Sequence, residues 1–338
     1  MATGAGREAQ RRNPIDRALR GWQPAQVLMA ANHLDLFTAL GEEALSAEEM
    51  ASRCGTHPRS TRMLLNACVA LGILEKEGPL YRNSAEARES LVRGKPTTYM
   101  GDAISHQEDL WQVWGKLHEA VRINRRVAER YSLVEEPEVH RNFILAMHNW
   151  AMRVAPLLAE ALDLSGRRQL FDAGGGPGTY SIFLVKRYPG LRAIVFDLPQ
   201  TIEIAREIIA DFGVANLVTT RAGDYFKDDF GQGNDAVLLS AILHSMGPER
   251  SRGLLQKAYD SLVPGGLVVV HESLISDDGT SPLQAALFSL NMPVNTGEGQ
   301  SYSGAEIMGL MEAVGFVGPR VIPLPEMVRT SLVMSAKP

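Results

Sequence analysis

Cysteine is scarce in this sequence, and its scarcity excludes several kinds of structure. Only Cys54 and Cys68 occur among 338 residues, and their number and spacing match neither a disulfide framework nor a metal site. The chain also has no H-E-x-x-H or C-x-x-C spacing, so we expect no bound metal. This pattern favours reduced cysteines in a cytosolic protein.

Long apolar runs and an excess of positive charge are also missing. No uncharged stretch approaches the roughly 20 residues that a membrane span needs, and no apolar segment follows the first arginines. The net charge of −5 creates no overall field that would attract nucleic acid. We therefore predict a cytoplasmic protein with no signal peptide, no membrane span and no nucleic-acid partner.

The hydrophobic pattern changes near residue 165, which indicates two domains. Before this point, apolar residues recur at three- and four-residue steps, as in amphipathic helices. After it, short apolar runs alternate with helical patterns, which is typical of an α/β fold with a mostly parallel sheet. The predicted strands are 169–173, 193–197, 217–224, 235–244 and 266–275, followed by an antiparallel pair at 319–325 and 328–338.

Within the helical part, a helix-helix-hairpin order resembles a winged helix. Ser46 and Glu49 form a predicted capping box, a second helix follows, and two extended pieces flank Gly78. DNA binding through Arg59 and Arg62 is one interpretation, and contact with another protein is the alternative. The many glutamates nearby favour protein contact, because a DNA reader needs several cations together.

The sharpest motif is a glycine-rich loop after the first α/β strand, Asp172-Ala-Gly174-Gly-Gly176-Pro-Gly178. Thr179 stands where a dinucleotide fingerprint would have its third glycine, and the chain has no P-loop. A carboxylate beside the loop would repel a pyrophosphate but suits a cofactor with an ammonium and a sulfonium group. S-adenosylmethionine is such a cofactor.

Two further acids strengthen this interpretation. Asp197 ends the second strand, from where a carboxylate can accept hydrogen bonds from ribose hydroxyls. Asp224 closes the third predicted strand, and Tyr225 and Phe226 beside it offer a stacking surface. Each acid alone would be interpreted as a helix N-cap, but three at successive strand ends point to cofactor binding.

With these motifs on hand, the chain resembles the class I S-adenosylmethionine-dependent methyltransferases, in particular small-molecule O-methyltransferases of the plant caffeate and bacterial polyketide type. The resemblance covers nearly the whole chain through DAGGGPG, FDLP, GDYF, ILHSMGPE, LVPGG and EGQSYSGAEI. It implies a Rossmann-like catalytic domain, S-adenosylhomocysteine as product, and a homodimer formed through the N-terminal domain. The expected organisation is a disordered tail (1–13), a winged-helix-like dimerisation domain (14–100), linking and substrate-lining helices (101–164) and the catalytic domain (165–338).

Motifs and resemblance together predict two sets of binding residues. The expected cofactor residues are Asp172, Gly174, Gly176, Asp197, Leu198, Asp224, Tyr225, Phe226 and Ser240. Residues at positions where the family lines its acceptor pocket are Met147, His148, Asn291, Met292 and Asn295. Ordinary capping or core packing is the alternative for this second set.

His244 is the predicted general base, because it ends the fourth predicted strand at the edge that carries the cofactor loop. Histidine changes charge near neutral pH, which suits proton removal from a hydroxyl. ILHSMGPE resembles the family motif LHDWxDE at Leu243, His244 and Glu249, but Ser245 and Met246 replace its Asp and Trp.

Glu272 matches one of two family glutamates that orient the histidine, a role that fixes the tautomer of the ring. The second family glutamate falls near Ser301 and is absent, with Gln300 or Glu298 as alternatives. The predicted activity is methyl transfer to a hydroxyl of an aromatic or polyketide-like small molecule. Alternatives are C- or N-methylation, a non-methylating use of the cofactor, or a ligand-sensing transcription regulator.

Overall fold

The computed structural model describes residues 13–95, 97–127 and 136–338. The predicted tail over 1–13 therefore lies, except for Asn13, outside the described residues. The chain divides into two compact units, residues 1–108 and 109–338, and the boundary falls inside helix α8 (Gly101–Trp114). Each unit has its own hydrophobic core.

The first unit is mainly helical and contains one small hairpin. Its other elements are α2 (Pro14–Arg20), α3 (Trp22–His33), α4 (Leu36–Leu40), α5 (Ala47–Cys54), α6 (Pro58–Ala70), β1 (Leu74–Glu77), β2 (Leu80–Asn83) and α7 (Ala85–Ser90). The predicted capping box is present, with Ser46 and Glu49 bonded reciprocally at the start of α5. The order helix, helix, hairpin is confirmed, whereas its interpretation as a winged helix stays a prediction.

The second unit alternates strands and helices after three N-terminal helices. Its helices after α8 are α9 (Leu117–Ile123), α10 (Pro137–Ala161), α11 (Thr179–Arg187), α12 (Pro199–Asp211), α13 (Pro248–Ser261), α14 (Leu283–Asn295) and α15 (Gly304–Val314), with short 3₁₀ turns η2 (Leu243–Ser245) and η3 (Glu326–Val328). Its strands are β3 (Gln169–Ala173), β4 (Arg192–Asp197), β5 (Val218–Ala222), β6 (Asn234–Ser240), β7 (Leu262–Glu272), β8 (Val317–Pro323) and β9 (Ser331–Ala336).

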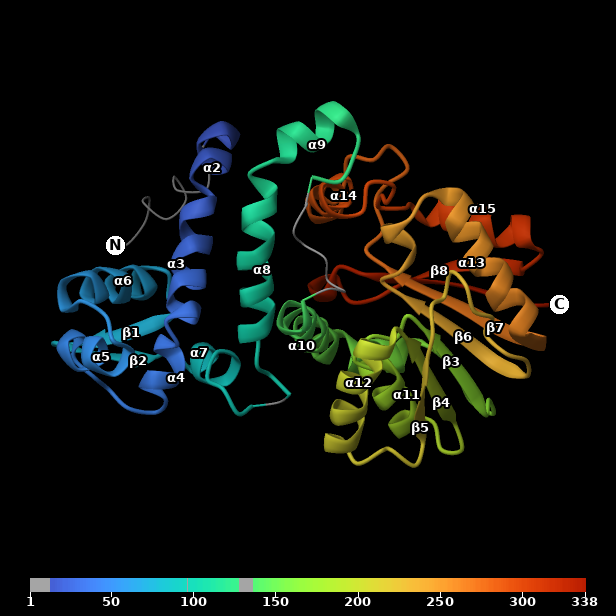
Figure 1. The fold of residues 1–338 in the computed structure, drawn as a ribbon, viewed down its shortest axis with the longest axis horizontal. Coiled ribbons are helices and arrows are strands. Elements are labelled where there is room, and N and C mark those ends of the chain that lie inside the picture. The colour runs from blue at the N-terminus through green and yellow to red at the C-terminus, as the bar shows by residue number, and fades with distance from the viewer. Residues whose placement is uncertain (1–12, 96, 128–135) are drawn as a thin grey trace, which may run out of the picture. The chain divides into compact units, whose positions relative to one another are not determined.

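These strands form one seven-stranded sheet in the order β5-β4-β3-β6-β7-β9-β8. The first five strands in this order are parallel, and β9 runs antiparallel to both β7 and β8. Successive side chains enter opposite cores: Leu170 and Leu238 pack with α10, α11 and α12, whereas Phe171 and Val237 pack with α13 and α15. Figure 1 shows α11 and α12 on one face of the sheet and α13 and α15 on the other. The predicted α/β fold with a C-terminal antiparallel pair is confirmed.

Two strands end earlier than their sequence pattern predicts. β6 ends at Ser240 because Ala241 adopts a left-handed conformation with φ of 55°, which places His244 in turn η2 and not in the strand. β5 ends at Ala222, and Asp224 lies in the following turn, where its main-chain N–H donates to the Asp228 carboxylate at 2.8 Å. Both residues still lie at the carboxyl edge of the sheet.

In residues 13–95, 97–127 and 136–338, no helix combines the length and the apolar character that a membrane crossing requires. The same residues contain no group of three or more His, Cys, Asp or Glu side chains arranged to hold a metal ion.

We expect Leu238→Ala to destabilise the second unit by about 2–5 kcal/mol, because the side chain is fully buried in the central strand and its removal leaves a cavity. Met327→Ala is the control, since this side chain is 82% exposed and its loss should change stability by less than about 0.5 kcal/mol. Urea denaturation followed by circular dichroism measures both. Equal midpoints for the two variants would contradict this packing.

Candidate active site

The glycine loop turns the chain sharply between β3 and α11. Its main chain is tied to the neighbouring strand by a hydrogen bond from Gly174 N–H to the Phe196 carbonyl at 2.8 Å. Gly174 has φ of 69°, and a Cβ atom there would lie 2.4 Å from the Ile242 side chain. A side chain at this φ would be strained and would displace Ile242, so glycine is favoured and leaves the main chain of the loop accessible.

Asp172 lies beneath this loop and is completely buried. One carboxylate oxygen accepts a hydrogen bond from the Ser181 hydroxyl at 2.7 Å, and the other is buried with no partner. Burial raises the pKa of Asp172 to about 7. Gly175 packs directly over this carboxylate, so the loop separates Asp172 from the surface.

Asp197, at the end of β4, accepts two main-chain hydrogen bonds. Gly176 N–H donates to Oδ2 at 2.8 Å and Leu198 N–H donates to Oδ1 at 2.7 Å. Burial raises the pKa of this carboxyl, and these hydrogen bonds oppose the shift. Each oxygen retains a further lone pair, so the group can still accept hydrogen bonds from a diol.

Asp224, Tyr225 and Phe226 form the third part of this edge. A hydrogen bond from Phe226 N–H holds the pKa of Asp224 below its usual range, and Lys227 lies 3.1 Å from the same carboxylate. The rings of Tyr225 and Phe226 meet edge to face at 4.6 Å, and the Arg250 guanidinium lies 3.9 Å above Phe226. An aromatic surface beside a carboxylate suits a purine with an exocyclic amine.

These residues fit an adenosyl sulfonium compound. The three acids follow successive parallel strands, so their charges converge on one edge. The unpartnered oxygen of Asp172 adds a buried negative charge when ionised, which favours a cation and disfavours a phosphate.

His244 and Glu272 form a close pair at this edge. The ring Nδ1 lies 2.8 Å from Glu272 Oε2, and the His244 main-chain N–H donates to Oε1 at 3.2 Å. Because a carboxylate only accepts, Nδ1 carries the proton of a neutral ring and Nε2 carries the lone pair. The Phe288 ring meets the imidazole edge to face at 4.8 Å. The arrangement presents one basic nitrogen in a fixed orientation.

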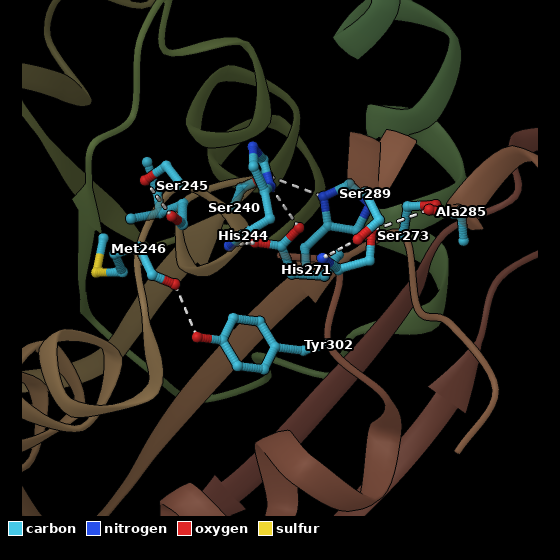
Figure 2. A network of polar contacts seen from close by, with 12 residues as sticks. Ser240, His244, Ser245, Met246, His271, Ser273, Ala285, Ser289 and Tyr302 are labelled. Atoms are coloured by element: carbon cyan, nitrogen blue, oxygen red, sulfur yellow. Dashed lines mark hydrogen bonds and ion pairs between the residues drawn. The ribbon is translucent and has the colours of Figure 1, made fainter. Parts of the chain in front are cut away.

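The segment after His244 differs from the family motif and is held in another way. Ser245 donates its hydroxyl to the Ile242 carbonyl at 2.7 Å, and Met246 is fully buried in the core. Tyr302 donates to the Met246 carbonyl at 2.7 Å, as Figure 2 shows. Gln300 N–H donates to the His244 carbonyl at 2.9 Å. The turn carrying His244 is therefore fixed at both ends.

Ser301, at the position of the second family glutamate, has a structural role here. Its hydroxyl donates to the Ala285 carbonyl at 3.0 Å, and its N–H donates to the Ser289 hydroxyl at 3.2 Å, so it joins this segment to α14. Glu298 is exposed and pairs with Arg250 at 3.5 Å. In the part of the chain that the structure describes, Glu272 is the carboxylate that contacts His244.

The residues expected to contact an acceptor fall into two groups. Asn291, Met292 and Asn295 lie on α14 with Phe288, and Asn291 accepts a hydrogen bond from the Trp114 indole at 2.5 Å. The Asn295 side-chain oxygen is buried without a partner. Met147, on α10, is half-buried.

His148 is only 7% exposed, and its Nδ1 lies 2.7 Å from the Thr179 hydroxyl at the start of α11. Burial lowers the pKa of His148 to about 4, so the ring is neutral near pH 7. This contact favours a role beside the cofactor loop over an acceptor contact. The contact between His148 and Thr179 was not predicted, because the two residues are 31 positions apart in the sequence.

His271 is a further residue that sequence reasoning did not single out. It pairs with Ser240 across β6 and β7, and its Nδ1 lies 2.8 Å from the Ser240 hydroxyl. Burial lowers the pKa of His271 to about 4, and Tyr180 packs against its ring at 5.2 Å. In the sequence, only the neighbouring Glu272 could have drawn attention to His271.

Comparison with known proteins agrees with this geometry. The O-methyltransferase domain family matches residues 106–317, and the O-methyltransferase dimerisation domain family matches residues 18–93. The chain is 36% identical to 3-hydroxy-5-methyl-1-naphthoate 3-O-methyltransferase of Streptomyces sahachiroi, over 89% of this chain and 88% of the relative. It is 35% identical to the tetracenomycin polyketide synthesis 8-O-methyl transferase of Streptomyces glaucescens, over 88% of each chain.

Among solved structures, human N-acetylserotonin methyltransferase in complex with SAM matches with a TM-score of 0.87 and 27% identity, covering 96% of both chains. The fold and the edge of strand-end acids define a Rossmann-like methyltransferase. More particularly, the chain belongs to the S-adenosylmethionine-dependent O-methyltransferase family. The family, fold class, enzyme class and cofactor predicted from the sequence are confirmed. The alternatives of C- or N-methylation and of a non-methylating use of the cofactor are not favoured.

We expect Asp172→Asn to change how the stability of the ligand-free protein depends on pH. The pKa is higher in the folded chain than the usual 3.8, so protonation of Asp172 favours the folded state. That contribution is complete below pH 3.8 and is lost as the pH rises through about 7. Relative to wild type, the variant should gain on the order of 2 kcal/mol between pH 5 and pH 8.

Chemical denaturation at several pH values measures this difference. Asp211→Asn, an exposed aspartate on α12, is the matched control and should follow the wild-type profile. Parallel curves for wild type and Asp172→Asn would show that the buried carboxyl does not titrate in this range.

Proposed function

We propose that this protein methylates a hydroxyl group of an aromatic or polyketide-like small molecule, with His244 as the general base. The observation that carries this proposal is the pair of contacts between Glu272 and His244, which leaves Nε2 as the basic nitrogen. The two Streptomyces relatives, whose names specify a naphthoate and tetracenomycin, support an aromatic acceptor.

The proposed cofactor site consists of the residues at the sheet edge. The glycine loop and Asp172 contribute main-chain atoms and charge, Asp197 and Leu198 bind the ribose, and Asp224, Tyr225 and Phe226 surround the adenine. Ser240, the last residue of β6, lies at the same edge of the sheet. The bound cofactor supplies the methyl group and the sulfur leaving group, so the protein must align the acceptor oxygen and remove its proton.

His244 performs the proton removal in this mechanism. Nε2 accepts the hydroxyl proton, and the resulting imidazolium is stabilised by Glu272 at Nδ1. The acceptor would be oriented by residues of α14 and α10, of which the apolar ones exclude water: Phe288, Asn291, Met292, Asn295 and Met147.

We further infer that the enzyme is a homodimer formed through its N-terminal unit, since the dimerisation domain family matches residues 18–93. The predicted domain limits and cytoplasmic location stay predictions.

We expect His244→Ala to lower kcat by about 10²- to 10⁴-fold, because the variant lacks the group that accepts the proton. Affinity for S-adenosylhomocysteine should stay close to that of wild type. Turnover of hydroxynaphthoic acids, followed by release of S-adenosylhomocysteine, measures the loss. His118→Ala is the control because this histidine is exposed. Near-wild-type turnover by His244→Ala at neutral pH would exclude the proposed base.

We expect Asp197→Asn to weaken binding of S-adenosylhomocysteine by roughly tenfold or more, because the amide accepts fewer hydrogen bonds and carries no charge. Isothermal titration calorimetry measures the affinity, with Asp211→Asn as the matched control. NADH should not bind to the wild-type protein. Tight binding of NADH without binding of S-adenosylhomocysteine would overturn the cofactor assignment.

A further inference from the structure

Two buried histidines of α10 contact hydroxyl groups at the starts of two other helices. His140 Nε2 lies 3.0 Å from the Thr201 hydroxyl, and His148 Nδ1 lies 2.7 Å from the Thr179 hydroxyl. The four residues are between 0% and 7% exposed. Positions 140 and 148 are eight residues apart, so both side chains lie on one side of α10.

The two threonines occupy the helix starts that border the proposed cofactor site. Thr179 directly follows Gly178, the last glycine of the loop, and is the first residue of α11. Thr201 lies in the first turn of α12, just after Asp197. One helix, α10, therefore contacts both the glycine loop and the segment that carries the proposed ribose ligand.

The two contacts hold helix starts that follow the loops of the proposed site. Thr201 comes shortly after Asp197 and Thr179 directly follows Gly178, so each contact ties α10 to one of these segments. Both contacts are buried, so removing either histidine takes a hydrogen-bond partner from a buried hydroxyl.

Asp197 itself is held by two main-chain donors, Gly176 N–H and Leu198 N–H. Leu198 is the N-cap residue of α12, so the position of the first turn of α12 also sets the position of one of these donors. Without His140, the buried Thr201 hydroxyl in that first turn loses a hydrogen-bond partner. The carboxylate would then be less well oriented for a diol.

We propose that His140 and His148 are positioning residues for the cofactor, which hold the start of α12, beside Asp197, through Thr201 and the start of α11 through Thr179. Neither histidine is a catalytic residue, because each acts through a threonine. The inference rests on the proposed function in that it takes Asp197 as a cofactor ligand. It gives His148 a role different from the acceptor contact that the sequence predicts.

A double-mutant cycle tests the first half of the proposal. S-adenosylhomocysteine is titrated calorimetrically into the full-length wild type, His140→Leu, Thr201→Val and the double variant. We expect each single substitution to weaken binding roughly tenfold. The double variant should bind about as weakly as the weaker single variant, because both changes break the same His140–Thr201 hydrogen bond.

Conservative replacement and kinetics separate positioning from general structural damage. His140→Gln places an amide donor near the position of Nε2 and should restore affinity to within roughly threefold of wild type. In His140→Leu, the KM for S-adenosylmethionine should rise while kcat at saturation stays nearly unchanged. His118→Leu, an exposed histidine, is the matched control.

The second half of the proposal is tested by His148→Leu and Thr179→Val, for which the same pattern is expected. Absence of S-adenosylhomocysteine binding by wild type would refute the proposed cofactor site itself. Binding by wild type together with unchanged affinity in His140→Leu and His148→Leu would overturn this inference alone. Additive losses in the cycle, or no recovery in His140→Gln, would also overturn it, and the isosteric threonine variants keep the test informative if a leucine variant does not fold.

Discussion

The contacts between Glu272 and His244 are the constraint on which the proposed chemistry depends. One carboxylate accepts from both the ring and the main chain of the histidine, so it fixes the ring orientation and the tautomer together. The two residues come from β7 and from the turn after β6, which are parallel neighbours in the sheet. The sheet register therefore places the base, and the surrounding segments only keep it there.

The parallel sheet also determines where three acidic side chains meet. Parallel strands bring their carboxyl ends to one side, where Asp172, Asp197 and Asp224 follow three of them. Their environments differ, since Asp172 is fully buried and Asp224 lies in an exposed turn beside Lys227. The buried member lies beneath main-chain atoms, while the others border the surface.

Much of this arrangement was predictable because local patterns carry it. The glycine spacing and the acids near strand ends were predictable from residues close together in the chain, and the resemblance to the family pointed to His244 and Glu272. Strand limits were less predictable, since apolar residues continue past Ser240 although Ala241 turns the chain. The role of Ser301, which replaces the second family glutamate, was also not predictable. Ser301 bonds to the main chain of Ala285, 16 residues away, and that contact exists only after folding.

Residue order alone predicted the alternation of strands and helices after residue 165 and the acidic loop that favours a sulfonium cofactor, because periodicity and motif spacing are local properties of a chain. Folding decided which side chains meet. His148 lies against Thr179, His271 against Ser240, and His140 against Thr201, each pair separated by 31 to 61 residues. Such pairs arise from the packing of α10 and the sheet register, and no local pattern encodes them.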